Sequence, residues 1–225
     1  MSTFVLIPGA GGVAWYWHGV AELLRAAGHE AIAVDLPGDD ESAGLAEYTR
    51  VVVEAVRGRS DDGDVVIVGQ SLGGFTAPLV AAQVPTRALV LVNAMIPTPG
   101  ETPGQWWGAT GWSEACLAAA ERGGYAVDFD PFVYFLHDVP PEVVAAGEAH
   151  QRPEADAVFA SVFDVAEWPA AGLHVVVGAD DRFFPAAFQR ALARDRLGLD
   201  VDVLPGGHLL ALARPRELVD YLQRV

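Results

Sequence analysis

Six short apolar runs recur along the chain, and most are separated by segments with a helical pattern. The runs are rich in valine, isoleucine and leucine and lie at residues 4–7, 31–34, 65–68, 88–92, 174–177 and 201–204. None of them alternates apolar with polar residues, so we expect each strand to be buried on both faces, as in a parallel sheet. Helices are predicted at residues 15–27, 45–57, 75–83, 185–197 and 215–224. This alternation predicts an α/β fold, with a mostly parallel sheet of about six strands and flanking helices.

One interval breaks this alternation. From residue 93 to about residue 168 no run has the pattern of a strand, whereas prolines, glycines and aromatic residues are frequent. Because a structureless loop of this length is uncommon in a compact domain, we interpret residues 94–168 as a mostly helical insertion that forms a lid. The sequence therefore predicts a single domain over residues 1–225 with one helical lid.

Composition narrows the function and the compartment. The chain has 14 basic side chains, all of them arginine, against 30 acidic ones, for a formal net charge of −16. The lack of lysine excludes Schiff-base chemistry at a lysine, and the negative charge disfavours nucleic acid and anionic membranes as partners. The single cysteine, Cys116, has no partner for a disulfide, and the N-terminal apolar run is too short for a signal peptide. We therefore expect a cytoplasmic protein.

The clearest chemical motif is Gly69-Gln70-Ser71-Leu72-Gly73, which follows the third apolar run and precedes a helical pattern. A sharp turn from strand to helix exposes a serine hydroxyl, and the glycines remove side chains that would collide in such a turn. The dipole of the following helix favours a developing oxyanion. The motif indicates Ser71 as a nucleophile; the alternative is an ordinary glycine-rich turn.

A serine hydroxyl needs a base to take its proton. The candidate bases are His18, His29, His137, His150, His174 and His208. Only His208 lies on a loop just beyond the last apolar run, and active sites of open α/β sheets form at the carboxyl ends of strands. The other five lie in the lid, at a helix start or beside the start of a strand. We therefore assign the base to His208.

A carboxylate should orient this histidine, and two adjacent ones follow the fifth apolar run. Asp180 and Asp181 both lie on this strand-end loop, and spacing alone does not separate them. Asp35, after the second run, is a rival that is more easily explained as a turn former. With either member of the pair, the chain order of serine, aspartate and histidine is one known for catalytic triads.

Two backbone N–H groups are needed to bind an oxyanion. One should belong to Leu72, directly after the nucleophile. The other should come from the loop at residues 8–12, where small residues let the backbone approach a substrate. This loop has neither the G-x-G-x-x-G pattern nor the G-K-[ST] ending of phosphate-binding loops, so phosphate binding is the weaker interpretation.

Over nearly its whole length the sequence resembles the α/β-hydrolase superfamily, and within it the small branch of methylesterases and hydroxynitrile lyases. The matching stretches are residues 4–12, 34–38, 69–74, 93–97, 137–140, 188–189 and 206–208. The resemblance implies Asp181 rather than Asp180 as the acid, because the family pattern places the acid eight residues before a glutamine, here Gln189. It also implies Ala10 as the second oxyanion donor.

Departures from the family bear on the reaction. Pro8-Gly9 stands where the family usually has His-Gly. This difference leaves the backbone N–H donor of Ala10 in place. The cyanogenic lyases carry a threonine at the position of Gly9 and a lysine at that of Leu209, and a departing cyanide needs this positive charge. The resemblance therefore favours ester hydrolysis over lyase activity.

From these residues we expect a serine carboxylesterase that acts on small, largely apolar esters and needs no metal or organic cofactor. The alternatives are a binding protein or receptor on the same fold with little turnover, and a cofactor-free perhydrolase or lyase on the same triad. A homodimer is compatible with the sequence. Most of the aromatic residues in the lid are expected to pack it onto the core, and one or two to line an apolar pocket. They are Trp106, Trp107, Trp112, Phe129, Phe132, Tyr134 and Phe135.

Overall fold

The computed structural model describes residues 1–59 and 64–225. In these residues a six-stranded sheet forms the centre of the molecule. Its strands follow the order β2-β1-β3-β4-β5-β6, and every neighbouring pair is parallel. The strands are β1 (Thr3–Ile7), β2 (Glu30–Ala33), β3 (Val65–Gln70), β4 (Ala88–Val92), β5 (Gly172–Gly178) and β6 (Asp202–Leu204). The predicted α/β sheet is confirmed, and it is parallel throughout.

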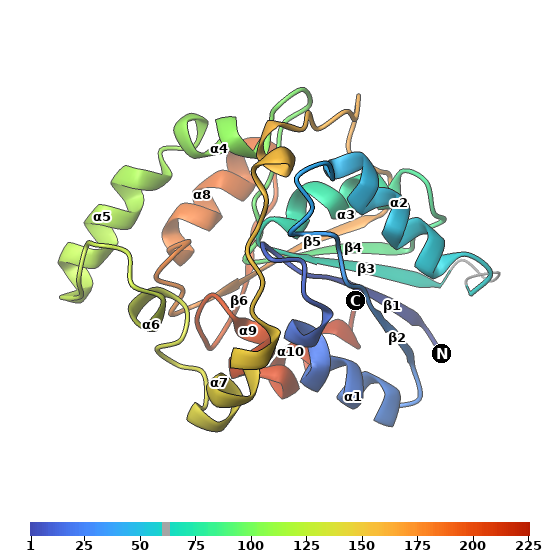
Figure 1. The fold of residues 1–225 in the computed structure, drawn as a ribbon, viewed down its shortest axis with the longest axis horizontal. Coiled ribbons are helices and arrows are strands. Elements are labelled where there is room, and N and C mark those ends of the chain that lie inside the picture. The colour runs from blue at the N-terminus through green and yellow to red at the C-terminus, as the bar shows by residue number, and fades with distance from the viewer. Residues whose placement is uncertain (60–63) are drawn as a thin grey trace.

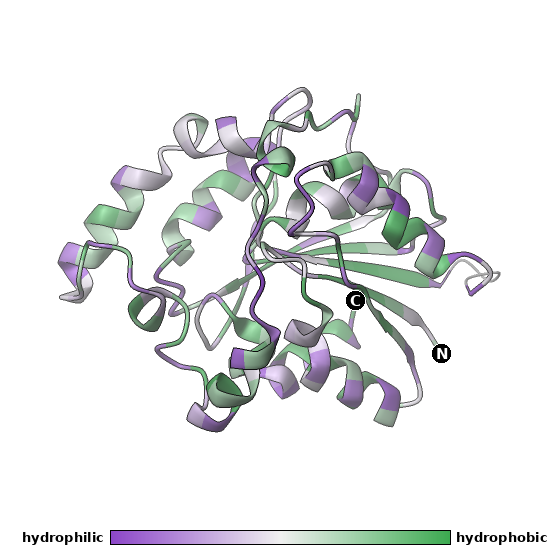
Figure 2. Ribbon diagram, viewed as in Figure 1, coloured by the Kyte–Doolittle hydropathy of each residue, from purple (hydrophilic) through white to green (hydrophobic). Residues whose placement is uncertain are grey.

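Helices cover both faces of the sheet (Figure 1). One face carries α1 (His18–Ala26), α9 (Leu210–Ala213) and α10 (Pro215–Leu222), and the other carries α2 (Leu45–Val56), α3 (Gly73–Ala81) and α8 (Ala186–Leu197). Side chains of β1 alternate between the two layers, because Val5 and Ile7 join one core and Phe4 and Leu6 join the other. The central strands are accordingly apolar along their length (Figure 2). Among the described helices, none combines the length and apolar character that a membrane crossing requires.

Some element boundaries and burials differ from the prediction. The first residues of the expected helix at 15–27 form a separate 3₁₀ helix, η1 (Ala14–Trp17), before α1 begins. Strand β6 is three residues long and lies at the edge of the sheet, where Val203 is 42% exposed. The expectation that every strand is buried on both faces is therefore wrong for β6, whose side chains are not fully covered by the flanking elements.

Residues 93–171 connect β4 to β5; all of them are described, and none is in a strand. They form α4 (Pro103–Ala109), α5 (Trp112–Gly123), α6 (Pro131–Tyr134) and α7 (Pro141–Gly147), with short 3₁₀ helices at η2 (Glu148–His150) and η3 (Asp156–Ala160). Helices α5, α6 and α7 lie on the opposite side of the molecule from the N-terminus (Figure 1). The mostly helical character of the insertion is as expected, whereas its role as a lid stays a prediction.

The first part of the insertion is anchored on the core by a buried tryptophan and an ion pair. Trp106 is fully buried, donates its indole N–H to Ile96 O at 3.1 Å, and packs against Phe184 with a ring-centroid distance of 5.2 Å. Arg196 of α8 pairs with Glu101, and both side chains are 7% exposed. These contacts bind the insertion to α8 and the loop before it.

Replacing Trp106 by alanine should lower the free energy of unfolding by about 3–5 kcal/mol, because it leaves a cavity where a fully buried indole packs. Phe132, which is 68% exposed, provides the control, and Phe132→Ala should change this free energy by less than about 0.5 kcal/mol. Urea unfolding of both variants measures the difference. A loss below about 1 kcal/mol for Trp106→Ala would show that the insertion is anchored elsewhere.

Candidate active site

Ser71 lies in the sharp turn between β3 and α3. Its φ of 51° falls in the left-handed region that residues other than glycine rarely adopt, and such strain is typical of functional turns. Two glycines make the turn sterically possible. A Cβ on Gly69 would lie 2.6 Å from the carbonyl oxygen of Gly73, and a Cβ on Gly73 would lie 2.6 Å from that of Pro8. The motif thus forms the strand–turn–helix that the sequence analysis expects.

The structure brings Ser71, His208 and Asp181 together. His208 Nε2 lies 3.2 Å from Ser71 Oγ, and His208 Nδ1 lies 2.9 Å from Asp181 Oδ2. His208 is 2% exposed and Asp181 4%, whereas Ser71 is partly exposed. An imidazole whose Nδ1–H donates to the carboxylate has Nε2 free to accept the serine hydroxyl proton.

Of the two adjacent carboxylates, only Asp181 reaches His208. Its Oδ1 accepts hydrogen bonds from the backbone N–H groups of Phe183 at 2.9 Å and Phe184 at 2.8 Å, so both carboxylate oxygens have donors. The Asp180 side chain is exposed, and its backbone N–H donates to Gly206 O at 2.9 Å. The loop therefore holds Asp181 in one orientation toward the imidazole.

Three phenylalanine rings surround the His208 imidazole. Phe135 of the insertion stacks on it with a centroid distance of 5.1 Å and an interplanar angle of 26°. Phe183 and Phe184 meet it edge-on at 5.1 Å and 5.0 Å. These contacts fix the plane of the ring and exclude water from its faces.

Asn93 is a buried polar residue that the sequence analysis did not assign to the site. Its side-chain N–H group donates to Gly207 O at 2.9 Å and to His208 O at 3.1 Å, while its Oδ1 accepts from Gly178 N at 2.7 Å. Its φ of 44° is again left-handed. The available signal was a lone polar residue directly after a fully apolar strand. Asn93 thereby joins the ends of β4 and β5 to the loop that carries His208.

Two buried glutamines complete this hydrogen-bonding network. Gln189 of α8 donates from Nε2 to Phe184 O at 2.6 Å and lies 3.3 Å from Asp181 Oδ2. Gln70, the last residue of β3, donates to His208 O at 3.3 Å. From the sequence, Gln189 marks only the family pattern; in the structure it also contacts the Asp181 carboxylate.

The two expected oxyanion donors lie on loops that pack together. A Cβ on Gly9 would lie 2.8 Å from Ser71 Cβ, so the loop that carries Ala10 lies directly against the turn that carries Leu72. Within the described residues, neither the Leu72 N–H nor the Ala10 N–H donates to another protein group. Both are therefore available to a bound molecule.

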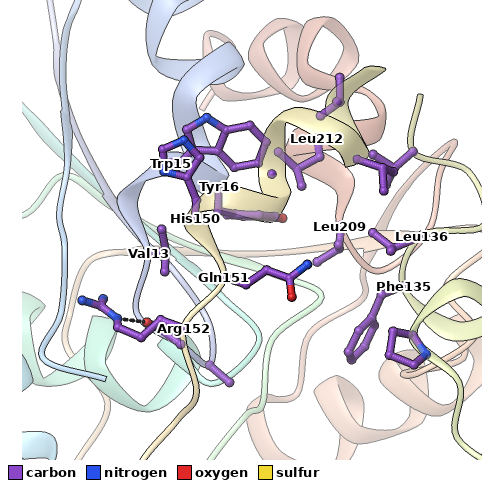
Figure 3. A pocket seen from close by; sticks show the side chains of 17 residues that line it. Val13, Trp15, Tyr16, Phe135, Leu136, His150, Gln151, Arg152, Leu209 and Leu212 are labelled. Carbon is purple, nitrogen blue, oxygen red and sulfur yellow. Dashed lines mark hydrogen bonds between the residues drawn. The ribbon is translucent and has the colours of Figure 1, made fainter. Parts of the chain in front are cut away.

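A cavity of about 400 Å³ opens beside this site (Figure 3). Ala10, Phe135 and Leu209 contribute to its wall, and they lie next to the oxyanion loop or to His208, although Ser71 and His208 do not line it themselves. Most of the remaining wall is apolar and includes Val13, Trp15, Tyr16, Leu136, Val139, Val143 and Leu212. The cavity has the size and character of a site for a small apolar group.

Residues 4–221 match the alpha/beta hydrolase family. The chain belongs to this family. The probable esterase PIR7A of Oryza sativa subsp. indica is 36% identical over 110 residues, a match that spans 45% of this chain and 42% of that protein. The esterase PIR7B of Oryza sativa subsp. japonica is 27% identical over 253 residues, which cover 99% of this chain and 94% of that protein. The solved structure of polyneuridine aldehyde esterase superposes with a TM-score of 0.81 at 22% identity, covering 100% of this chain and 98% of that one, and it shares the fold.

The other candidate residues of this alpha/beta hydrolase lie in different environments. His18 and His150 stack on Trp15 at 4.4 Å and 4.9 Å, and His29 meets a ring of β1 edge-on. Asp35 accepts a hydrogen bond from Ala14 N at 2.8 Å at the start of η1, a contact across 21 residues, so its interpretation as a turn former stays a prediction. In the part of the chain that the structure describes, no group of three or more histidine, cysteine, aspartate and glutamate side chains is arranged to hold a metal ion.

The seven aromatic residues of the insertion named above lie in different environments. Tyr134 is buried, and Phe129, 58% exposed, stacks on it at 5.7 Å. Trp106, Trp107 and Trp112 pack onto the core, so three of the seven do so rather than most of them. Phe135 lines the cavity. Phe132 is 68% exposed and does not pack on the core. The sequence analysis missed the aromatic residues outside the insertion that help to form the cavity wall, because they lie about 120 residues away in the chain, in η1.

Replacing Asn93 by alanine should lower the free energy of unfolding of this hydrolase by about 2–4 kcal/mol. The substitution removes the side-chain partner of the buried Gly178 N–H and Gly207 O, and it leaves His208 O with Gln70 as its donor. Gln83, an exposed residue whose amide contacts only a nearby backbone carbonyl, is the control, and Gln83→Ala should cost less than about 0.5 kcal/mol. Equal urea midpoints for the two variants would contradict the role assigned to Asn93.

Proposed function

We propose that this alpha/beta hydrolase is a serine carboxylesterase that acts through Ser71, His208 and Asp181. The observation that carries the proposal is the position of the His208 imidazole, 3.2 Å from Ser71 Oγ and 2.9 Å from Asp181 Oδ2. The related proteins PIR7A and PIR7B carry the names of esterases, which supports an ester as the substrate.

In the acylation step, Ser71 Oγ attacks the ester carbonyl carbon while His208 Nε2 takes the hydroxyl proton. Asp181 accepts the hydrogen bond from Nδ1–H and stabilises the imidazolium that forms. The backbone N–H groups of Leu72 and Ala10 donate to the oxygen on which negative charge develops. The bond to the alcohol then breaks, and Nε2 returns the proton to the leaving oxygen, so Ser71 carries the acyl group.

Deacylation repeats the same steps with water. Nε2 of His208 takes a proton from water as the water oxygen attacks the acyl carbon, and the same two N–H groups bind the second oxyanion. When the acyl bond to Ser71 breaks, the proton passes to Oγ. The carboxylic acid leaves, and the site returns to its starting state.

The cavity supports small, largely apolar esters as substrates. Arg152 is the one arginine among the described residues that line it, and its guanidinium donates to the backbone carbonyls of Gly11, Gly12 and Leu36. Leu209, directly after His208, is apolar. Because Leu209 stands where the cyanogenic lyases carry a lysine, hydrolysis is favoured over the release of cyanide. The insertion supplies part of the cavity wall, and we propose that it serves as the lid.

A fluorophosphonate should label Ser71, and short p-nitrophenyl esters should be hydrolysed. Ser71→Ala and His208→Ala should each lower kcat on the order of 10⁴–10⁶-fold, and Asp181→Asn roughly 10⁴-fold. Ser113, which is exposed on α5, provides the matched control, and Ser113→Ala should be labelled and should turn over like the wild type. Mass spectrometry locates the label, and p-nitrophenolate release gives kcat.

The outcome separates this proposal from its alternatives. Labelling of Ser71 without ester turnover would favour a binding protein on the same fold. Turnover that appears only when peroxide is added would favour a perhydrolase. Absence of labelling would contradict a reactive Ser71 altogether.

The length of the acyl chain should matter, because a longer chain buries more apolar surface in the cavity. From p-nitrophenyl acetate to butyrate, kcat/KM should rise by up to about fourfold for each CH₂ group. Val143→Trp narrows the cavity and should abolish this gain while it leaves acetate within about twofold of the wild type. Val162, 54% exposed, is the control site for Val162→Trp. A chain-length profile of Val143→Trp equal to that of the wild type would place the acyl group elsewhere.

A further inference from the structure

Residues 151–155 of the insertion lie against the loop that follows β1, the loop that carries Ala10. The backbone of this segment is tied down at its far end, where Ala155 N–H donates to Gly38 O at 2.6 Å. Two of its side chains, Arg152 and Glu154, reach the backbone of the Ala10 loop. The insertion and the candidate oxyanion loop are therefore joined by polar side chains as well as by packing.

Glu154 receives two hydrogen bonds that fix its carboxylate. Its Oε2 accepts from Gly11 N–H, and its Oε1 accepts from the hydroxyl of Tyr48. Burial raises the pKa of the Glu154 carboxyl, and the hydrogen bonds from Tyr48 and Gly11 oppose this shift. A half-buried carboxylate with both oxygens engaged is held in one orientation, so it holds the Gly11 N–H as well.

Arg152 holds the other side of the same backbone. Its Nε donates to Gly11 O at 2.7 Å (Figure 3), and its Nη2 donates to Gly12 O at 2.8 Å and to Leu36 O at 2.6 Å. A rigid, planar guanidinium with three carbonyl partners is an anchor for the backbone.

The orientation of Ala10 N–H follows from this loop geometry. The Gly9 carbonyl and the Ala10 N–H belong to one trans peptide group, so they point in opposite directions. Gly12 N–H donates to Gly9 O at 3.0 Å and thereby determines which way Ala10 N–H points. This turn needs φ values of 84° at Gly11 and 64° at Gly12, and these are the glycines that Arg152 and Glu154 contact.

We infer that Arg152 and Glu154 are positioning residues for the oxyanion donor at Ala10, an inference that rests on the proposed function. Neither residue acts on the reacting carbonyl group; both act through the turn at residues 9–12. The insertion then does more than cover the cavity, because it also helps to build the oxyanion hole.

Glu154→Ala should lower kcat roughly ten- to hundredfold and change KM by less than about twofold. Complete loss of one oxyanion donor costs about 10²–10³ in kcat, and a displaced donor costs less. The loss appears in kcat because the contact forms in the transition state. Glu154→Gln retains an acceptor for Gly11 N–H, and its amide group can donate to the Tyr48 oxygen. This variant should therefore keep kcat within about threefold of the wild type.

Glu101→Gln is the control, because Glu101 is a buried carboxylate of the same insertion that pairs with Arg196 rather than with the Ala10 loop. Its kcat should stay within about twofold of the wild type, and thermal unfolding of every variant verifies that the fold persists. Amide hydrogen exchange gives a readout that needs no turnover. Exchange at Gly11 N–H should accelerate by about tenfold or more in Glu154→Ala and stay unchanged in Glu101→Gln.

Failure of this inference is distinguishable from failure of the proposed function. If the wild type hydrolyses no ester, the proposed function fails, and the rate of fluorophosphonate labelling at Ser71 then tests the inference, since a phosphoryl oxygen occupies the same hole. Glu154→Ala should slow this labelling as it slows kcat. Two results for Glu154→Ala would overturn the positioning role. One is faster exchange at Gly11 N–H with kcat and the labelling rate unchanged, and the other is a higher KM at constant kcat.

Discussion

The burial of a parallel sheet on both faces is the constraint on which the rest of the structure depends. Every residue of β1, β3 and β4 is buried, so a polar side chain within these strands would need a partner inside the core. The chemistry is therefore confined to the places where strands end. Ser71 follows β3, and Asp181 and His208 lie on the loops after β5 and β6. Because the strands run parallel, these ends meet at one edge.

Asn93 shows how a buried polar group serves stability and geometry together. In an interior of low dielectric constant, a fully satisfied polar network is rigid, whereas an unsatisfied one is costly. The amide of Asn93 meets this requirement with backbone groups of β5 and of the His208 loop. The same hydrogen bonds that stabilise the ends of the strands therefore hold the backbone of the His208 loop against them.

The sequence predicts those parts of the fold and site that have a local signature. Apolar runs predict the strands, and the turn around Ser71 carries its own glycine pattern. The assignment of Asp181 over Asp180 needed a family resemblance, because adjacent residues of a loop point in directions that spacing does not reveal. The contacts of Glu154 with Gly11, like the cavity wall, join segments more than 100 residues apart and have no local pattern. The edge position of β6 likewise depends on strand order, which burial patterns alone do not specify.

Residues that meet in the site lie far apart in the sequence, so their contacts form only after most of the chain has been synthesised. The contact between Ser71 and His208 spans 137 residues, and that between Gly11 and Glu154 spans 143. Closing such long loops costs chain entropy before any contact offsets it, and contacts of this sequence separation are typical of slower folding. Because synthesis starts at the N-terminus, Ser71 emerges from the ribosome well before His208, its proposed base. The hydroxyl of Ser71, the proposed nucleophile, therefore has no base within reach until residue 208 has been synthesised. In a truncated or half-folded chain it is an unactivated alcohol.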